Sequence, residues 1–211
     1  MSNVIVDQAI YRAGRRIPYG DLSDELHPLA VEDAVKGNQR PKLDVYDDTI
    51  FVSMKTLRYI DATSDVETGE VMIFVGDRFV VTVRRGEANP LNNVRARLEH
   101  APEHLAHGPI AVLYSVMGSI VDNYTLIDTE LNEDLDLIEQ QVFSGARGVD
   151  ASEIYRLKRE VLEVKRAATP LMLPLRRLRS DDEMPIMHVE TQPFFGDISD
   201  HLLRVIDHID S

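Results

Sequence analysis

The sequence predicts an α+β or α/β fold, in which an N-terminal mixed β-sheet is packed between helices and is followed by a long antiparallel helix hairpin and the start of a stalk helix. Two observations lead to this prediction. Short apolar segments separated by turn dipeptides fill the first half of the chain, whereas apolar residues recur every three or four positions after Gly108-Pro109. We therefore divide the 211 residues into an α/β domain at 1–100, a helix hairpin at 101–180, and a linker with the truncated start of the stalk helix at 181–211.

The first hundred residues are expected to combine strands with short helices. One helix should begin near Pro28, which suits the first helical turn, and should end at Gly37. Another should begin at Asn89-Pro90, with Asn as the cap. Asp47-Asp48 and Gly76-Asp77 are turn dipeptides between apolar runs. Strands are predicted at residues 4–11, 43–46, 49–60, 71–75 and 78–84.

Two long amphipathic helices should form the hairpin. A break at residues 145–149 separates them, and Asp150 with Glu153 resembles a capping box at the start of the second. Pro170 and Pro174 should bend or end that second helix. The first apolar stripe contains Leu113, Met117, Ile120, Tyr124, Ile127 and Leu131, and the second contains Ile154, Leu157, Val161, Val164, Ala168 and Leu171.

The last segment reads as a third helix that stops in mid-pattern. Its apolar face consists of Ile198, Leu202, Val205, Ile206 and Ile209. Because the pattern reaches Ser211 without a stop signal, we expect the natural chain to continue. The uncharged segment 108–121 is shorter than the roughly 20 apolar residues of a membrane span, so we predict a buried helix and a soluble fragment.

Composition and charge narrow the classes of partner. The chain has 36 acidic and 23 basic residues and a net charge of −13, which argues against nucleic acid and fits metal cations or basic partners. It has no cysteine, so a metal would be held by carboxylate, carbonyl, imidazole or water. Acidic residues of the first long helix should pair with basic residues of the second.

The sequence offers no recognisable catalytic motif. It contains no Gly-rich phosphate loop, no nucleophile elbow and no H-E-x-x-H pattern, so we predict that the protein is not an enzyme. His100, His104 and His107 have the spacing of a zinc site, but Pro102 interrupts the helix that this site would need. We therefore interpret them as structural or surface histidines.

Several separated motifs resemble the CorA magnesium-transporter family. They are His27-Pro-Leu-Ala-Val-Glu-Asp-Ala34, the segment Gln39-Arg-Pro-Lys42, Tyr46-Asp-Asp48, Ile120-Val-Asp-Asn-Tyr124 and Phe194-Phe-Gly-Asp-Ile-Ser-Asp-His201. The resemblance implies a cytoplasmic domain at the inner membrane that gates a homopentameric channel, with the membrane reached through C-terminal helices that this chain lacks. The segment before His27 is shorter than is usual in the family.

The resemblance also implies a regulatory Mg²⁺ site between neighbouring subunits. Glu32 and Asp33 would come from one subunit, and Asp197 and His201 from another, with Asp122 as a further candidate. Asp197 and His201 are four residues apart and share a helix face. Whether His201 binds the ion directly stays open, because Mg²⁺ prefers oxygen ligands.

Other interpretations of the same residues stay open. Glu32 and Asp33 could simply form a solvated helix face, and Asp197 could interact with the helix dipole. The ion could be Co²⁺ or Zn²⁺, since a zinc-transporting branch shares the architecture. A soluble α/β enzyme with a helical appendage would require a pocket with paired titratable groups.

Overall fold

A computed structural model describes residues 11–12, 15–16, 26–86, 88, 91–144, 151–180, 184–187 and 189–211. Strands β1 (Tyr11–Arg12) and β2 (Arg15–Arg16) form a short antiparallel pair. Residues 4–10 of the first predicted strand lie outside the described residues, as do the cap residues Asn89-Pro90 and Asp150.

The main sheet has four strands in the order β3-β4-β5-β6, which are β3 (Lys42–Tyr46), β4 (Thr49–Ile60), β5 (Asp65–Gly76) and β6 (Phe79–Arg85). Each pairs antiparallel with its neighbour, because short turns join consecutive strands. The described sheets are therefore antiparallel rather than mixed. Strand β5 also begins six residues before the predicted residue 71, because the segment from Asp65 pairs with β4 despite its polar sequence.

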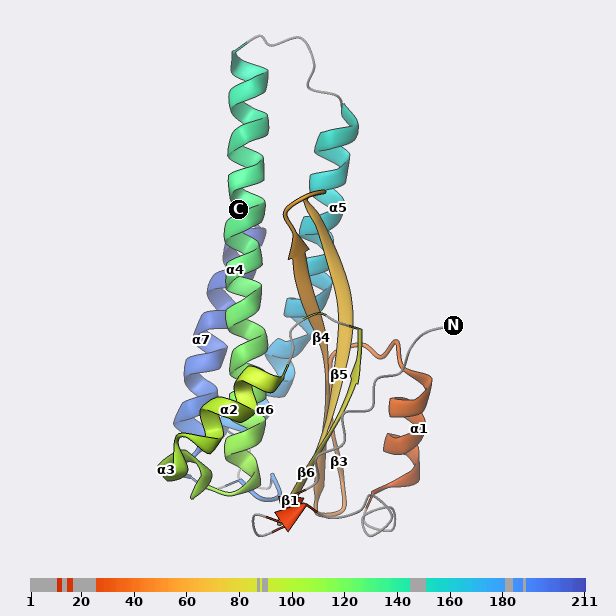
Figure 1. Cartoon of the computed structure of the whole chain (residues 1–211), viewed down its shortest axis with the longest axis vertical. Coiled ribbons are helices and arrows are strands. Elements are labelled where there is room, and N and C mark those ends of the chain that lie inside the picture. Colours follow the sequence, from red (N-terminus) through yellow and green to blue (C-terminus); the bar gives the residue numbers. More distant parts are fainter. Residues whose placement is uncertain are drawn as a thin grey trace.

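Helices cover both faces of this sheet (Figure 1). Helix α1 (Pro28–Lys36) packs on one face, where Ala30 and Ala34 contact a cluster that includes Phe51 and Phe74. The other face is covered by α4 (Pro109–Phe143), α5 (Ala151–Ala168), η3 (Thr169–Leu171), α6 (Met172–Ser180) and α7 (Gln192–Ile209), whose apolar residues share a second, larger core with β4 and β5. The short helices α2 (Asn92–Glu99) and α3 (Pro102–Leu105) precede α4. The predicted helix-covered sheet is confirmed.

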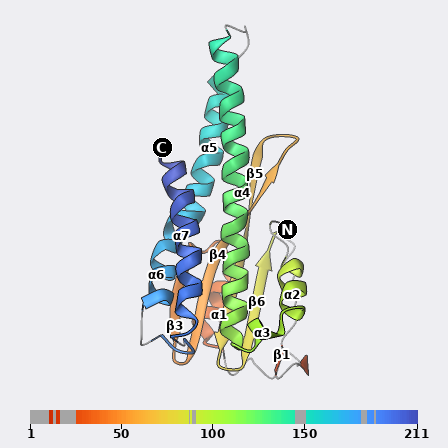
Figure 2. The same ribbon diagram turned by 90° about the vertical axis from the view of Figure 1, so that its left-hand side faces the viewer.

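The hairpin of α4 and α5 extends beyond the end of the sheet (Figure 2). Its predicted bend is confirmed, because α5 ends at Ala168 and the segment with Pro170 continues as the 3₁₀ turn η3. Pro174 lies within the first turn of α6, where a proline is tolerated.

The predicted charge pairing across the hairpin was wrong for the described side chains. Basic residues of α5 pair elsewhere, with Arg159 on Asp65 of β5 and Lys165 on Asp210 of α7. Asp134 of α4 bonds to the sheet instead. The apolar stripes therefore hold the two helices together, and the charges contact the elements that flank them.

Helix α4 is the one described helix with the length and apolar composition of a membrane span, and half of its most apolar window is buried in the protein. Ile110, Leu113, Met117 and Ile120 are fully or almost fully buried. The predicted buried helix over this segment is confirmed.

Candidate functional site

Helix α1 begins after His27 of the first predicted motif and ends at Gly37, the predicted helix end. The His27 ring accepts a hydrogen bond from the Leu29 amide at 3.3 Å and stacks on Tyr46, with ring centres 4.4 Å apart. Gly37 ends the helix with a φ of 65°, a backbone conformation that favours glycine. The His-Pro motif therefore sets the start of α1 and joins it to β3.

The two acidic residues of α1 have different surroundings. Glu32 pairs with Lys36 one turn along the helix, and both side chains are at least half exposed. Asp33 is 26% exposed and lies 2.7 Å from the Nζ of Lys42 on β3. Lys42 also pairs with Asp44 at 2.8 Å. Burial lowers the pKa of Lys42, but hydrogen bonds to Asp33 and Asp44 outweigh it and raise the pKa overall, so Lys42 stays charged at neutral pH.

The remaining predicted ligands meet between α4 and α7, which lie side by side in both ribbon views (Figures 1 and 2). The Nδ1 of His201 is 3.4 Å from Oδ1 of Asp122, and its Nε2 is 3.8 Å from Oδ1 of Asp197. All three side chains are more than one-third exposed. Burial, followed by the charges of Asp197 and Asp122, raises the pKa of the nearby Tyr114. The structure thus brings together the three predicted ligands Asp122, Asp197 and His201, although Asp122 and His201 lie 79 positions apart in the sequence.

The two halves of the predicted ligand set lie on opposite sides of the sheet. Glu32 and Asp33 belong to α1, whereas Asp122, Asp197 and His201 belong to α4 and α7 on the other face (Figure 1). Within the described part of the chain, no group of three or more histidine, aspartate or glutamate side chains is arranged to hold a metal ion. One copy of the chain therefore presents two separate sets of donors.

The donor chemistry fits a hydrated divalent cation. Carboxylate oxygens that are partly exposed can bind Mg²⁺ directly or through its water, and Asp33, Asp122 and Asp197 are all partly exposed. The imidazole of His201 adds a ligand type that Zn²⁺ and Co²⁺ accept more readily than Mg²⁺.

Sequence reasoning missed two contacts around these residues. Lys42 was part of a motif, but nothing in its spacing indicated that it would neutralise Asp33 nine positions away. The half-exposed ring of His208 on α7 lies 2.5 Å from Oδ2 of the buried Asp128 on α4, a contact that the sequence did not indicate. Both contacts depend on how helices pack, so local patterns contain no signal for them.

Of the three histidines with zinc-like spacing, His100 and His107 make described side-chain contacts. The ring of His100 forms a hydrogen bond with the carbonyl of Ala96, and His107 lies edge-on to Phe194 with ring centres 5.8 Å apart.

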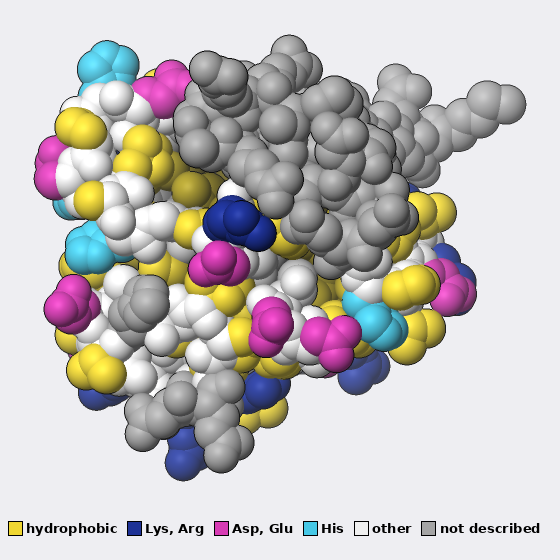
Figure 3. All heavy atoms as spheres, turned by 90° about the horizontal axis from the view of Figure 1, so that it is seen from below, with side chains coloured by type: hydrophobic (Ala, Val, Ile, Leu, Met, Phe, Trp, Pro, Cys, Tyr) yellow, Lys and Arg dark blue, Asp and Glu magenta, His cyan; other side chains and the backbone are white. Residues whose placement is uncertain are grey.

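At the lower end of the molecule, acidic, basic and histidine side chains are interspersed among apolar ones (Figure 3). The visible charges of that face are therefore mixed in sign.

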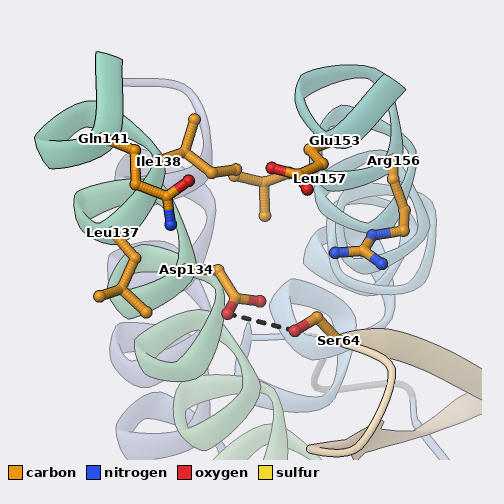
Figure 4. A pocket seen from close by; sticks show the side chains of 8 residues that line it. All are labelled: Ser64, Asp134, Leu137, Ile138, Gln141, Glu153, Arg156 and Leu157. Atoms are coloured by element: carbon orange, nitrogen blue, oxygen red, sulfur yellow. Dashed lines mark hydrogen bonds between the residues drawn. The ribbon is translucent and has the colours of Figure 1, made fainter. Parts of the chain in front are cut away.

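A pocket lies between α4, α5 and the turn that joins β4 to β5 (Figure 4). Asp134 accepts hydrogen bonds from Tyr59 at 2.6 Å and from Ser64 at 3.3 Å, while Glu153 and Arg156 line the α5 side. Burial and the bond to Asp134 raise the pKa of Tyr59 to about 12. Asp134 thus joins the sheet to the hairpin, and its carboxylate is engaged in structural bonds.

Comparisons with known proteins agree with one another. The family model described as CorA-like Mg²⁺ transporter protein matches residues 19–211. The chain is 35% identical over 185 residues to the putative metal ion transporter YfjQ of Bacillus subtilis, an alignment that covers 88% of this chain and 56% of that protein. It is 24% identical over 187 residues to the cobalt/magnesium transport protein CorA of Thermotoga maritima, with 88% and 53% covered.

A solved structure has the same fold. The soluble domain of CorA from Methanocaldococcus jannaschii superposes with a TM-score of 0.73 at 17% identity, over 98% of this chain and 92% of that one. The chain spans about half the length of the two curated relatives.

Proposed function

Since the chain belongs to the CorA-like Mg²⁺ transporter family, we propose that it is the cytoplasmic regulatory domain of a homopentameric divalent-cation transporter in the inner membrane. In this role it senses intracellular Mg²⁺ at the interfaces between identical subunits and controls a channel formed elsewhere in the assembly. The names of the two relatives describe metal-ion transport rather than catalysis, which supports a role without enzymatic activity.

The observation that supports this proposal best is the division of the ligand set. Asp33 lies on one side of the sheet, and Asp197 lies with Asp122 and His201 on the other. In a ring of identical subunits, one side of each subunit faces the opposite side of its neighbour. A heterologous contact of this kind can therefore bring Asp33 of one copy toward Asp197 of the next.

Charge explains how such a site would regulate a channel. Carboxylates that approach across an interface repel each other, and a divalent cation between them cancels the repulsion. High Mg²⁺ would then favour a closed, symmetric arrangement, and loss of Mg²⁺ would let the subunits separate. The cation needs only to bind one arrangement better than the other for this shift to occur.

A magnesium titration tests the proposal. In the assembled transporter and in this chain, millimolar Mg²⁺ should raise the thermal unfolding temperature or the mass in solution. The isosteric pair Asp33→Asn/Asp197→Asn should move the midpoint of this response to at least about tenfold higher Mg²⁺. Asp200→Asn is the matched control, since it removes one exposed charge from the same helix. A response that is equal in the double variant and the parent rules out these ligands.

The zinc or cobalt alternative rests on His201, whose ring lies between two carboxylates. If the site holds Zn²⁺ or Co²⁺ through this ring, His201→Gln should weaken the response to those ions much more than the response to Mg²⁺. If His201→Gln weakened the responses to all three ions equally, the ring would only position the neighbouring carboxylates and would not discriminate between metals.

A further inference from the structure

Lys42 stands between two carboxylates next to the proposed ligand Asp33. Its Nζ is 2.7 Å from Oδ2 of Asp33 and 2.8 Å from Oδ2 of Asp44, and it lies 5.5 Å from the centre of the Phe51 ring. The Lys42 side chain is 32% exposed. Two charged partners and an aromatic ring therefore hold this ammonium in a half-buried position.

We propose that Lys42 is a built-in counter-ion that competes with the divalent cation for Asp33 and thereby sets the Mg²⁺ concentration at which the domain responds. This inference rests on the proposed function, because that function makes Asp33 a ligand. The proposed function names residues that would bind the metal, and this inference adds one residue, Lys42, that would compete with the metal.

Competition follows from where the ammonium lies. One oxygen of Asp33 is already bonded to Lys42, and the positive charge repels an approaching Mg²⁺. The metal must therefore displace Lys42 or share the carboxylate with it. Asp44 makes displacement feasible, since the ammonium can leave Asp33 and still keep a partner on its own strand.

The neighbouring pair of Glu32 and Lys36 provides an internal comparison. Lys36 is 65% exposed and Glu32 51%, so water competes strongly for both charges. Lys36 lies on α1 whereas Lys42 lies on β3, and removing Lys36 takes away the same charge close to Asp33 without breaking a contact to it. If the two substitutions change the Mg²⁺ midpoint by different amounts, the difference therefore reports the direct contact of Lys42 with Asp33 rather than the loss of a nearby positive charge.

The opposite role is also testable. If Lys42 served only as a strut that fixes α1 against β3, removing it would disorder Asp33 and weaken Mg²⁺ binding. Competition predicts the reverse sign. The direction of the change in affinity therefore separates the two roles.

The experiment measures Mg²⁺ binding by titration calorimetry and by thermal unfolding in the assembled transporter. Lys42→Gln should move the Mg²⁺ midpoint to about three- to tenfold lower concentration, whereas Lys36→Gln should change it by less than about twofold. The double variant Asp33→Asn/Lys42→Gln should not show this shift of the Mg²⁺ midpoint to lower concentration. An unchanged or higher midpoint in Lys42→Gln overturns the inference.

A metal-free measurement checks the contact itself. A double-mutant cycle of Asp33→Asn and Lys42→Gln, followed by urea unfolding in a chelator, should show favourable coupling between the two side chains. Additive effects would overturn the inference even if Mg²⁺ binding changed.

The two proposals fail in different ways. If the parent does not respond to Mg²⁺ but Lys42→Gln does, the proposal that the parent senses Mg²⁺ is refuted, and the proposal that Lys42 competes with the metal is supported. If the parent responds and Asp33→Asn responds equally, the proposed ligand is wrong and the inference falls with it. If neither the parent nor Lys42→Gln responds, both are overturned.

Discussion

At the scale of single residues, Glu160 shows how a buried charge can join two elements. Its side chain is 2% exposed. Its Oε2 accepts a hydrogen bond from the Val66 amide at 2.8 Å, and its Oε1 accepts one from the Nε of Arg159 at 2.9 Å. The carboxylate therefore fixes the beginning of β5 to the middle of α5. A buried charge of this kind is tolerated because both oxygens are bonded.

Replacing this carboxylate should destabilise the domain. Glu160→Ala leaves the buried Val66 amide without a partner, so the free energy of unfolding should fall by about 1–3 kcal/mol in urea denaturation. The control is Glu163→Ala on the same helix, where the lost contact is a more exposed pair with Arg166 and the change should stay below about 1 kcal/mol. Equal losses in the two variants would contradict this assignment.

At the scale of elements, the short helix α1 depends on contacts made by its neighbours. It spans nine residues, which is too short for a stable isolated helix. His27 caps its start, and the guanidinium of Arg85 on β6 donates to the carbonyls of Ala34 and Val35 at its end. A cation at this end also interacts favourably with the helix dipole.

Arg85→Met should therefore loosen α1 without unfolding the rest of the domain. Hydrogen exchange of the α1 amides should become about tenfold faster, while the α4 amides keep their protection. Arg78→Met serves as the control, because Arg78 is 70% exposed in the turn before β6. Unchanged exchange in α1 would show that packing of Ala30 and Ala34 alone holds the helix.

Helices α4 and α7 contact each other through two aspartate–histidine pairs along their length. His201 meets Asp122 at 3.4 Å and His208 meets Asp128 at 2.5 Å. The histidines are seven residues apart and therefore lie on the same face of α7. The predicted ligand His201 thus belongs to a longer contact between these helices.

At the scale of the whole molecule, α7 is part of the main core rather than an appendage. Phe195, Ile198, Leu202 and Val205 are at most 3% exposed and belong to the cluster shared by the sheet, α4, α5 and α6. A single core of this kind should unfold as one cooperative unit.

A pair of adjacent leucines tests this cooperativity. Leu202 is fully buried, so Leu202→Ala should lower the free energy of unfolding by about 2–5 kcal/mol, and the sheet and the helices should unfold together. Leu203 is 38% exposed, and Leu203→Ala should cost less than about 1 kcal/mol. The measurement is thermal unfolding by circular dichroism, with hydrogen exchange of the β4 and β5 amides. Separate transitions for sheet and helices would argue against a single unit.

The sequence alone determined the features that depend on near neighbours along the chain. The first turn of α1 at Pro28, its end at Gly37, the buried stripe of α4 and the break at Pro170 are all local effects of backbone and side-chain geometry. The motifs also predicted the family correctly.

The tertiary structure decided what depends on distant partners. The polar start of β5 becomes a strand because β4 lies beside it, and pairing outweighs the weak strand preference of Glu67 and Gly69. Lys42 meets Asp33, and His201 meets Asp122, only after helices and sheet have packed. Charges act over distances in space rather than along the chain, so their partners could not be predicted from spacing, and the chemistry of the candidate site depends on those partners.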